Sequence, residues 1–575
     1  MLADALKAVW ERYSNHLSHP DFAAIRHSSG LILLGSVGLA ILAIVLRLFA
    51  ASSTSDPGSL PLALEKQGAR TFGFLSRMSF YLNCSDLYAD AWHRFNKHGL
   101  PVLVPTLGAR KEIFLPHSSL KWAISQPSRV LGMWDAFSEM FQLGHSLGDE
   151  KYMLDIWPHM LSRQVLTREL DDHLMDVHDE LHYAMETRLG GDTQSWSERE
   201  LLDTIRLIIT QVGSRFTVGK TLCRNDEYLR LIMDTVDNVV TTAGALGFIP
   251  ETIRPLFAKL ICLPTFLKLR RLENRYYKAE FKTRLAALAA GDPDQPVDLL
   301  QKMLRFASKH RKEELATSQM TRRICMSSLA FVYLASFTTT NIVNKMMTSD
   351  AEHDTLSILR DEAERFLSEN PDPRKLWTRS KTKDMIYADS VMRESLRLYT
   401  VPTRAVVRKV MVDGVVSDTG LPLPKGALIS FVSQPMHTDP DRWDDPMRYD
   451  PFRFVRLRQM TDKSMFSDEN HVRDAVSDDV SDNFNPNSFL STSGLLVFGR
   501  GKNSCPGRLL MEIQLKMLIS NLVRNYDIRL ADHDSKTPRP AANSWVLEFI
   551  FPSSRTRFQF KRRTARVASV PAVKA

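Results

Sequence analysis

The chain has 575 residues, of which 44% are hydrophobic and 25% are charged, as in an ordinary globular protein. Its formal net charge of +9 is modest for this length, so we expect no nucleic-acid partner. The five cysteines are widely spread and form no CxxC pair, which indicates a reducing compartment and argues against disulfides or a structural zinc site. The densest basic cluster, Lys561-Arg562-Arg563 with Arg566, is either a solvated tail or a surface for anionic lipid or an acidic redox partner.

The first feature in chain order is an apolar segment near the N-terminus. Residues 27–46 contain no Lys, Arg, Asp or Glu, and about twenty helical residues are enough to cross a bilayer. A cleaved signal peptide would lie nearer the terminus, and a buried core helix would show a polar face. We therefore predict an N-terminal tail at 1–26, a single transmembrane anchor at 27–47 and a linker at 48–61.

Beyond residue 61 helical periodicity dominates, and we predict one large domain at 62–575 that is mainly α with smaller β-sheets (α+β). Ser197 and Glu200 form a capping-box pattern before the apolar face of a helix that begins at Leu201. The predicted further elements are helices near 224–241, 251–285, 313–348, 355–369 and 382–398, a strand around 404–412, and a solvated acidic loop at 456–487.

The helix predicted around Ile324–Met347 contains three consecutive threonines, 338–340. β-Branched residues are poor helix formers, and the hydroxyl of Thr339 can donate to the carbonyl of Ala335 and bend the helix. Such a bend could hold a water that relays protons, which makes Thr339 a candidate catalytic residue. A plain threonine run is the alternative.

One loop carries the strongest chemical signal, Phe498 to Arg508 (FGRGKNSCPGR). Its glycines allow the backbone to approach a flat ligand, and Pro506 suits the first position of a following helix. Cys505 is therefore predicted to face unpaired N–H groups that favour its thiolate. A thiolate on haem iron promotes O–O cleavage, while a buried structural cysteine is the alternative.

The pattern Phe498-x-x-Gly501-x-x-x-Cys505-x-Gly507 resembles the haem-binding signature of the cytochrome P450 family. Three further phrases resemble family elements and keep their order over most of residues 62–560: 335–340 (oxygen-activation helix), Glu394-x-x-Arg397, and Pro451-Phe452-Arg453-Phe454. Asn503 stands where an arginine is usual, and Cys-Pro-Gly-Arg follows it. In this respect the loop resembles that of the fungal branch that includes ent-kaurene oxidases and indole-diterpene oxygenases.

The resemblance implies roles for individual residues. Cys505 would ligate the iron of haem b, and Thr339 would take part in proton delivery. The other implied roles are contact with the cofactor (Arg163, Arg408, Phe498, Gly501, Gly507) and a structural ion-pair network (Glu394, Arg397, Arg453). Thr338 replaces the family's acidic residue, which leaves the proton route open. The spacing of Glu394 and Arg397 is not distinctive by itself, because Glu362 and Arg365 share it.

The implied protein is a monooxygenase of the endoplasmic reticulum membrane, single-pass, with a cytosolic catalytic domain and electrons from an NADPH-cytochrome reductase. It would insert one oxygen atom from O2 into a hydrophobic small molecule of fungal secondary metabolism, a terpenoid, polyketide or alkaloid. Pocket walls are expected to include Phe331, Ala335 and Val401–Thr403. A haem-thiolate isomerase, dehydratase or peroxide-driven enzyme and a non-catalytic haem-binding membrane protein are the alternatives.

Overall fold

The computed structural model describes residues 60–564, apart from 83, 107–109, 250, 252, 370–375, 402, 465–494 and 532–541. The predicted tail, the predicted anchor at 27–47 and nearly all of the predicted linker lie outside these residues. The same is true of most of the predicted acidic loop. The first part of that predicted loop is helical instead: α24 spans Arg453–Ser464. The buried Val455 anchors this helix.

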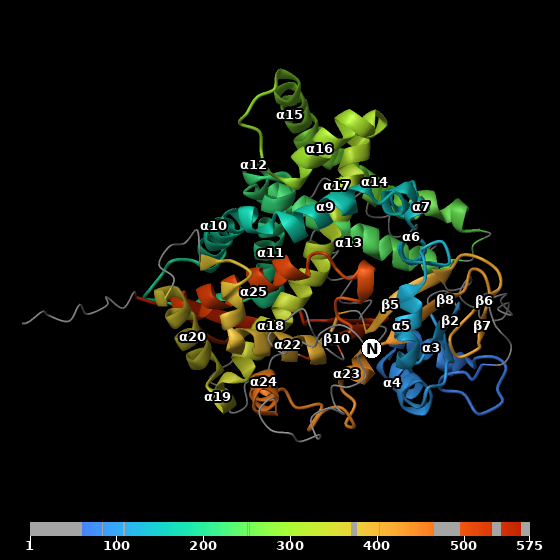
Figure 1. Cartoon of the computed structure of the whole chain (residues 1–575). Helices are drawn as coiled ribbons and strands as arrows, with labels where there is room; N and C mark the ends of the chain where they lie inside the picture. The colour runs from blue at the N-terminus through green and yellow to red at the C-terminus, as the bar shows by residue number, and fades with distance from the viewer. Residues whose placement is uncertain are drawn as a thin grey trace, which may run out of the picture.

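Helices make up most of the described chain, and Figure 1 shows them grouped to one side of a smaller region that contains the largest sheet. The predicted helices are all present, with shifted ends. The main helices are α3 (Phe74–Leu82), α4 (Cys84–Arg94), α5 (Leu120–Ser125), α6 (Met133–Met140), α7 (Leu143–Ser146), α8 (Lys151–Leu154), α9 (Trp157–Arg168), α10 (Leu170–Leu189), α11 (Leu201–Val218), α12 (Lys220–Cys223), α13 (Asp226–Phe248), α14 (Arg254–Leu272), α15 (Lys278–Ala290), α16 (Leu299–His310), α17 (Thr317–Leu329), α18 (Ser336–Thr348), α19 (Asp350–His353), α20 (Thr355–Glu369), α22 (Ile386–Leu398), α23 (Gln434–His437) and α25 (Arg508–Asn525).

The largest sheet has five strands in the order β1-β2-β8-β5-β3. All neighbours in it are antiparallel except β2 and β8, which are parallel. The strands are β1 (Val102–Pro105), β2 (Lys111–Phe114), β3 (Leu131–Gly132), β5 (Arg404–Val410) and β8 (Leu428–Val432). The sheet and α4 share a hydrophobic cluster that is distinct from the main helical core. The predicted strand at 404–412 is therefore confirmed as β5.

Three smaller sheets complete the fold, and one of them overturns the predicted capping box. Ser197–Glu200 form strand β4, which pairs with β12, and α11 begins directly at Leu201. Pairing with a distant strand outweighs the local capping pattern, and no side-chain cap bond forms at Glu200. The small sheets are β4-β12-β9, β10-β11 and β6-β7, with β6 at Val415–Val416, β7 at Pro422–Leu423, β9 at Tyr526–Leu530, β10 at Ser544–Val546, β11 at Phe549–Phe551 and β12 at Arg557–Arg562.

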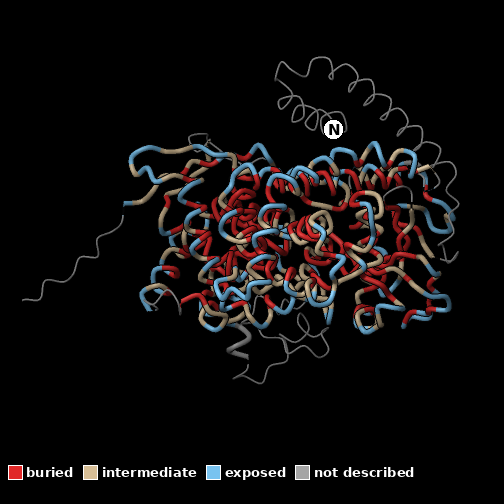
Figure 2. The backbone as a smooth tube through the Cα atoms, turned by 90° about the horizontal axis from the view of Figure 1, so that it is seen from above, coloured by how far each residue is buried: buried red, intermediate tan, exposed pale blue. Residues whose placement is uncertain are grey.

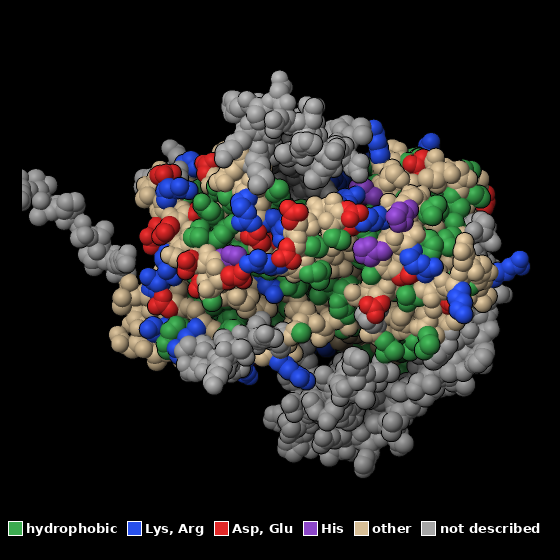
Figure 3. Space-filling model, turned by 90° about the horizontal axis from the view of Figure 1, so that it is seen from below, with side chains coloured by type: hydrophobic (Ala, Val, Ile, Leu, Met, Phe, Trp, Pro, Cys, Tyr) green, Lys and Arg blue, Asp and Glu red, His purple; other side chains and the backbone are tan. Residues whose placement is uncertain are grey.

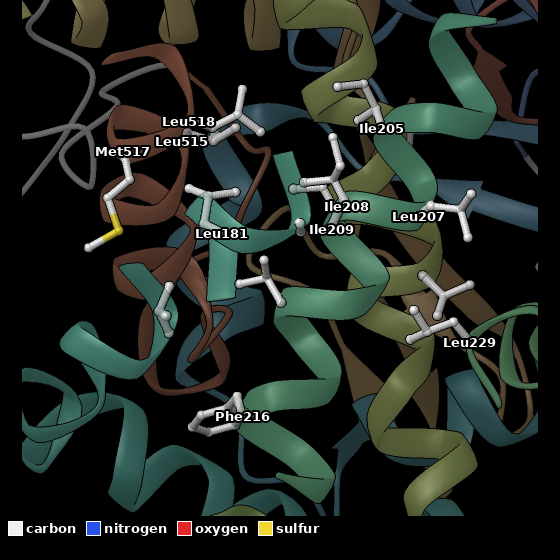
Figure 4. Packing of buried hydrophobic residues seen from close by; sticks show 14 of the residues in the cluster. Leu181, Ile205, Leu207, Ile208, Ile209, Phe216, Leu229, Leu515, Met517 and Leu518 are labelled. Atoms are coloured by element: carbon white, nitrogen blue, oxygen red, sulfur yellow. The ribbon is translucent and has the colours of Figure 1, made fainter. Parts of the chain in front are cut away.

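Helix α11 lies at the centre of the main core. Figure 4 shows Ile205, Ile208 and Ile209 of α11 between Leu181 of α10 and Leu515 and Leu518 of α25 on one side and Leu229 of α13 on the other. Figure 2 shows the same arrangement along the whole chain, with buried segments inside and exposed ones at the periphery. Contacts on both sides explain why most of the residues of α11, polar ones included, are buried.

Within the described residues, one helix is long and apolar enough to cross a bilayer, Thr317–Thr348. It consists of α17, the π-helical segment η7 (Ala330–Ala335) and α18. About half of its apolar window, 56%, is buried inside the fold, and it packs against α11 and α22. Its apolar character therefore reflects packing in the protein interior.

Charges of both signs are interspersed on the face of the molecule seen in Figure 3. In the C-terminal basic cluster Arg562 pairs with Glu186 at 2.9 Å, and Arg563 pairs with Asp527 at 2.6 Å. Lys561 lies over the ring of Trp196. These partners neutralise or cover most of the described part of the cluster.

Candidate haem-thiolate active site

Cys505 lies in a tight loop that its own backbone holds. Its N–H donates to the carbonyl of Phe498 at 2.9 Å, and the N–H of Ser504 donates to the carbonyl of Gly501 at 3.0 Å. Gly499 and Gly501 have φ values of 64° and 69°, which favour glycine. The turn thus requires glycine at 499 and 501, whereas Gly507 has a φ of −77° that other residues also adopt, and α25 starts at Arg508 directly behind it.

Of the five cysteines, all within the described residues, Cys505 alone is partly exposed. Burial raises the pKa of its thiol, and the N–H groups of Gly507 and Arg508 and the charge of Arg508 offset this rise only in part. In the chain alone, desolvation of the sulfur therefore outweighs the N–H groups that favour the thiolate. A cation at the sulfur would reverse the balance.

Neighbouring elements brace the loop. Arg508 donates to the hydroxyl of Ser504 and to the carbonyl of Cys505, both at 2.8 Å. Arg163, on α9, donates to the carbonyl of Lys502. The structure thus brings Arg163, for which contact with the cofactor was predicted, to the cysteine loop, and it adds Arg508 as a group that holds the loop's shape.

A β-bulge directs Arg408. In β5, Arg404 and Ala405 pair with Val432 and Phe431, but Arg408 pairs with Ile429, so one residue of β5 is extra. Val406 and Val407 together oppose the single residue Ser430 of β8. Val406 has a φ of 55°, an unusual value for a β-branched residue. Because the register changes by one, Arg404 and Arg408 lie on opposite faces of the sheet although they are four residues apart.

Arg408 is 4% exposed, and burial lowers its pKa to about 10. Within the described residues no carboxylate pairs with it, and it donates only to the carbonyl of Val407. A buried cation without an anion is costly, so its surroundings are suited to an anionic ligand group. This matches the propionate role that the resemblance implied for Arg408.

Half-buried apolar side chains surround the cysteine loop, among them Phe498 and Leu510. Leu334, which lies in the middle of a core-crossing helix, is nevertheless 43% exposed, and Ala330 one turn earlier is exposed too. The partly exposed thiol of Cys505 and the guanidinium of Arg408, which has no carboxylate partner among the described residues, supply the two groups that a flat cofactor with carboxylates needs. The exposure of Leu334 and Ala330 was not predicted from the sequence, because periodicity does not reveal which positions of an apolar helix stay uncovered.

The threonine segment has the geometry expected from the sequence. The hydroxyl of Thr339 donates to the carbonyl of Ala335 at 2.7 Å, and that of Thr340 donates to the carbonyl of Ser336 at 2.8 Å. Both bonds follow directly on the π-helical segment η7. Such π segments are rare and are frequent at functional sites.

Two aromatic residues of this helix, Phe331 and Phe337, pack against other elements. Phe331 covers Gly213 of α11, where an added Cβ atom would lie 2.5 Å from its ring. Phe337 is 4% exposed and packs against Phe551 with ring centroids 5.0 Å apart. Phe337 is therefore buried among packed neighbours, whereas Phe331 and Ala335 both keep partial exposure.

Glu394, Arg397 and Arg453 contact one another. Glu394 receives bonds from Arg397 at 2.8 Å and from Arg453 at 3.2 Å, and Glu394 and Arg397 are completely buried. Arg397 also donates to the carbonyls of His437 and Pro446. A buried network of this kind fixes the relative positions of its elements, here α22 and the segment that enters α24.

The second Glu-x-x-Arg sequence serves a different purpose. Glu362 is buried and accepts the N–H groups of Tyr387 and Ala388 at 2.8 and 2.9 Å. It thereby caps the start of α22, the helix that carries Glu394.

His159 lies on α9, four residues before Arg163. Its ring packs edge-on against Trp134, and burial lowers the pKa of His159 to about 4.

Comparison with known proteins agrees with this geometry. The family model "Cytochrome P450" matches residues 159–560. The chain is 38% identical to the cytochrome P450 monooxygenase astC of Aspergillus terreus (88% of this chain, 93% of that protein) and 37% identical to pbrC of Penicillium brasilianum (88% and 92%).

A solved structure, retinoic-acid-bound cyanobacterial CYP120A1, superposes with a TM-score of 0.57 at 18% identity. The superposition covers 88% of this chain and all of that chain, and it shows a shared fold. The fungal relatives are monooxygenases, and the family binds haem through a thiolate. This chain therefore belongs to the cytochrome P450 family and is a haem-thiolate monooxygenase.

Proposed function

We propose that this protein is a membrane-anchored monooxygenase that inserts one oxygen atom from O2 into a hydrophobic intermediate of fungal secondary metabolism. The observation that carries the proposal is Cys505, the one partly exposed cysteine, held between backbone N–H groups at the start of α25. Its relatives astC, pbrC and tenB are fungal cytochrome P450 monooxygenases.

Haem b, bound by the Cys505 thiolate, supplies the activation of dioxygen. The chain itself contributes binding and proton handling. Phe498, Gly501 and Gly507 allow the cofactor to approach the loop, and Arg163 and Arg408 supply cations for its carboxylates. Thr339 holds a hydroxyl on the helix next to the π segment, where it can pass a proton to a neighbouring water.

The substrate is proposed to be bulky and apolar, a terpenoid, polyketide or alkaloid. Exposed Leu334 and Ala330 offer an uncovered apolar surface on this helix, and Ala335 extends it towards Thr339. No charged side chain lies between Ala330 and Thr340 on this helix. Such a wall favours hydrophobic contact over ion pairing with the substrate.

Membrane attachment is proposed from two features. The apolar segment at 27–46 is long enough to cross a bilayer. In addition, α14 carries four exposed leucines at helical spacing: Leu256, Leu260, Leu263 and Leu267, at 76%, 50%, 48% and 58% exposure. An exposed leucine row of this kind suits contact with lipid on the cytosolic side of the endoplasmic reticulum.

The membrane proposal is testable with protein that lacks residues 1–47. We expect it to float with phosphatidylcholine vesicles and to lose this binding on substitution of Leu260→Glu with Leu267→Glu. Leu100→Glu, a change at another exposed leucine, is the matched control. Equal flotation of all three proteins would remove α14 from the proposed contact.

Electrons are proposed to come from an NADPH-cytochrome reductase that docks near the cysteine loop. Lys502 is exposed there, whereas Arg508 is occupied with the carbonyl of Cys505 and the hydroxyl of Ser504. Lys502→Glu is therefore the cleaner test than any change at Arg508. Stopped-flow reduction should slow in this variant, and an unchanged rate would rule out Lys502 as a docking contact.

The first experiment is the carbon monoxide difference spectrum of the dithionite-reduced protein. The parent should show a strongly red-shifted Soret band that Cys505→Ser abolishes. Cys325→Ser, which changes a buried cysteine of α17, should keep the band. A folded parent that takes up no haem would refute the proposed function.

A further inference from the structure

The hairpin β10–β11, like the pair β6–β7, is a two-stranded sheet. Its two strands pair only with each other, through three residue pairs, and join no larger sheet among the described residues. A two-stranded hairpin is at best marginally stable by itself. Its position must therefore depend on contacts with the rest of the protein.

The hairpin bridges the two halves of the molecule. Phe551 packs on Phe337, with ring centroids 5.0 Å apart, and also contacts Tyr333, at 6.3 Å. Trp545 and Leu547 pack instead against the cluster under the large sheet. Phe549, Phe551 and Tyr333 remain half-buried, next to the exposed Leu334. The hairpin thus stands beside the open apolar surface of the helix.

The turn of the hairpin holds a buried acid. Glu548 is 8% exposed, and its carboxylate accepts a bond from Nε of Arg404. Its backbone carbonyl accepts the hydroxyl of Thr403 at 2.6 Å and the N–H of Thr403 at 3.3 Å. The preceding Leu547 has a φ of 54°, which a leucine adopts only under constraint. The strained turn places Glu548 where Arg404 can bind it.

Arg404 is held from its other side by Glu112 of β2, at 3.0 Å, and Glu112 is completely buried. The bulge in β5 makes this arrangement possible. Arg404 shares the sheet face of Val432, and Glu112 pairs with Leu428, which lies on that same face. Arg408 points to the opposite face. In β5, Arg404 therefore binds the hairpin, whereas Arg408 lies on the opposite face of the sheet, where it is proposed to bind a carboxylate of the cofactor.

We propose that Arg404 and Glu548, backed by Glu112, are positioning residues that hold Phe549 and Phe551 against the helix and so set the space for a bulky hydrophobic substrate. The inference rests on the proposed function, since it concerns which substrates fit beside the apolar surface of Leu334 and Ala330. Removal of the Glu548 charge would leave Arg404 with one carboxylate and free the turn, while leaving the cysteine loop untouched.

The test compares a bulky and a small iron-binding probe, clotrimazole and imidazole, by their difference spectra. In Glu548→Gln we expect the Kd of clotrimazole to rise about tenfold, the effect of one lost aromatic contact, and that of imidazole to stay within about twofold. Hydrogen exchange of residues 543–552 should be faster in the same variant. Glu198→Gln, which breaks the exposed pair with Arg557, is the matched control and should change neither.

A triple variant, Arg404→Met with Glu112→Met and Glu548→Met, removes all three charges of the network but keeps apolar volume, and it should show the same selective loss if Glu548→Gln fails to fold. Unchanged Kd ratios and unchanged exchange in a folded variant would overturn the inference. A parent without the red-shifted carbon monoxide band would instead refute the proposed function. The hydrogen-exchange comparison would still report whether the ion pair holds the hairpin.

Discussion

The hydroxyl of Thr339 donates to the carbonyl oxygen of Ala335 at 2.7 Å, at the point where the π-helical segment η7 ends. One residue further on, Thr340 makes the same bond to Ser336 at 2.8 Å and is equally buried, at 1% exposure. The two threonines thus form a matched pair that differs only in the direction they face on the helix.

We expect Thr339→Ala to lower product formed per NADPH consumed by about a hundredfold, the usual loss when a proton-transfer group is removed. Thr340→Ala should stay within about threefold of the parent, because its hydroxyl only satisfies a carbonyl. The assay uses a compound from a terpenoid and polyketide panel that shifts the haem spectrum. Equal losses in both variants would assign Thr339 a purely structural role.

Arg408→Met should speed the loss of haem. The guanidinium is buried without a carboxylate partner, so a cofactor carboxylate is the anion that suits it. Loss of one charge-assisted bond corresponds to about tenfold faster transfer of haem to apomyoglobin. Lys409→Met removes the neighbouring cation, which pairs with Glu139 at 2.8 Å, and should leave the rate unchanged. A rate in Arg408→Met equal to that of the parent would contradict the assignment.

Two glycine substitutions in helices should change stability in opposite directions. In Gly213→Ala the new methyl group meets the ring of Phe331 at 2.5 Å, and overpacking of this kind costs about 1–3 kcal/mol. At Gly244 of α13 no atom lies within 4 Å of an added Cβ, so Gly244→Ala should add about 0.5–1 kcal/mol. The measurement is the Tm of the haem-bound Gly213→Ala and Gly244→Ala variants, each compared with the parent. A Tm of Gly213→Ala above that of the parent would show that the ring of Phe331 can move aside.

Stability should depend on pH through Glu362. Burial raises the pKa of this carboxyl to about 7, although the N–H groups of Tyr387 and Ala388 and the charges of Lys516 and Arg365 act against the rise. A carboxyl with a raised folded pKa adds stability below its unfolded pKa and loses it as the pH rises through about 7. The Tm of the parent should therefore fall more steeply between about pH 5 and pH 8 than that of Glu362→Gln.

Glu364→Gln changes an exposed acid on the same helix and should leave the slope of Tm against pH unaltered. Parallel curves for the parent and Glu362→Gln would mean that the Glu362 carboxyl titrates normally in the folded protein.

Much of the fold was open to prediction because it depends on local patterns. The helix that carries Thr339, the helix after Cys505 and strand β5 were all expected from periodicity and turn residues, and the Thr339 bond to Ala335 follows from helix geometry alone. The capping box at Ser197 failed for the opposite reason. Its residues pair with β12, more than 350 positions away in the chain, and no local pattern encodes that pairing.

The sequence by itself determined the candidate chemical groups: a cysteine in a glycine-rich turn, a threonine run, and the Glu-x-x-Arg patterns that include those at Glu362 and Glu394. Only the tertiary structure decided which Glu-x-x-Arg meets a third arginine, that Glu362 caps α22, and that Arg404 and Arg408 face opposite sides of one strand. The physical reason is that burial, ion pairing and strand register depend on partners distant in sequence. The pKa of Cys505 shows this most directly, since desolvation by the surrounding fold outweighs the helix N–H groups that the local sequence places beside it.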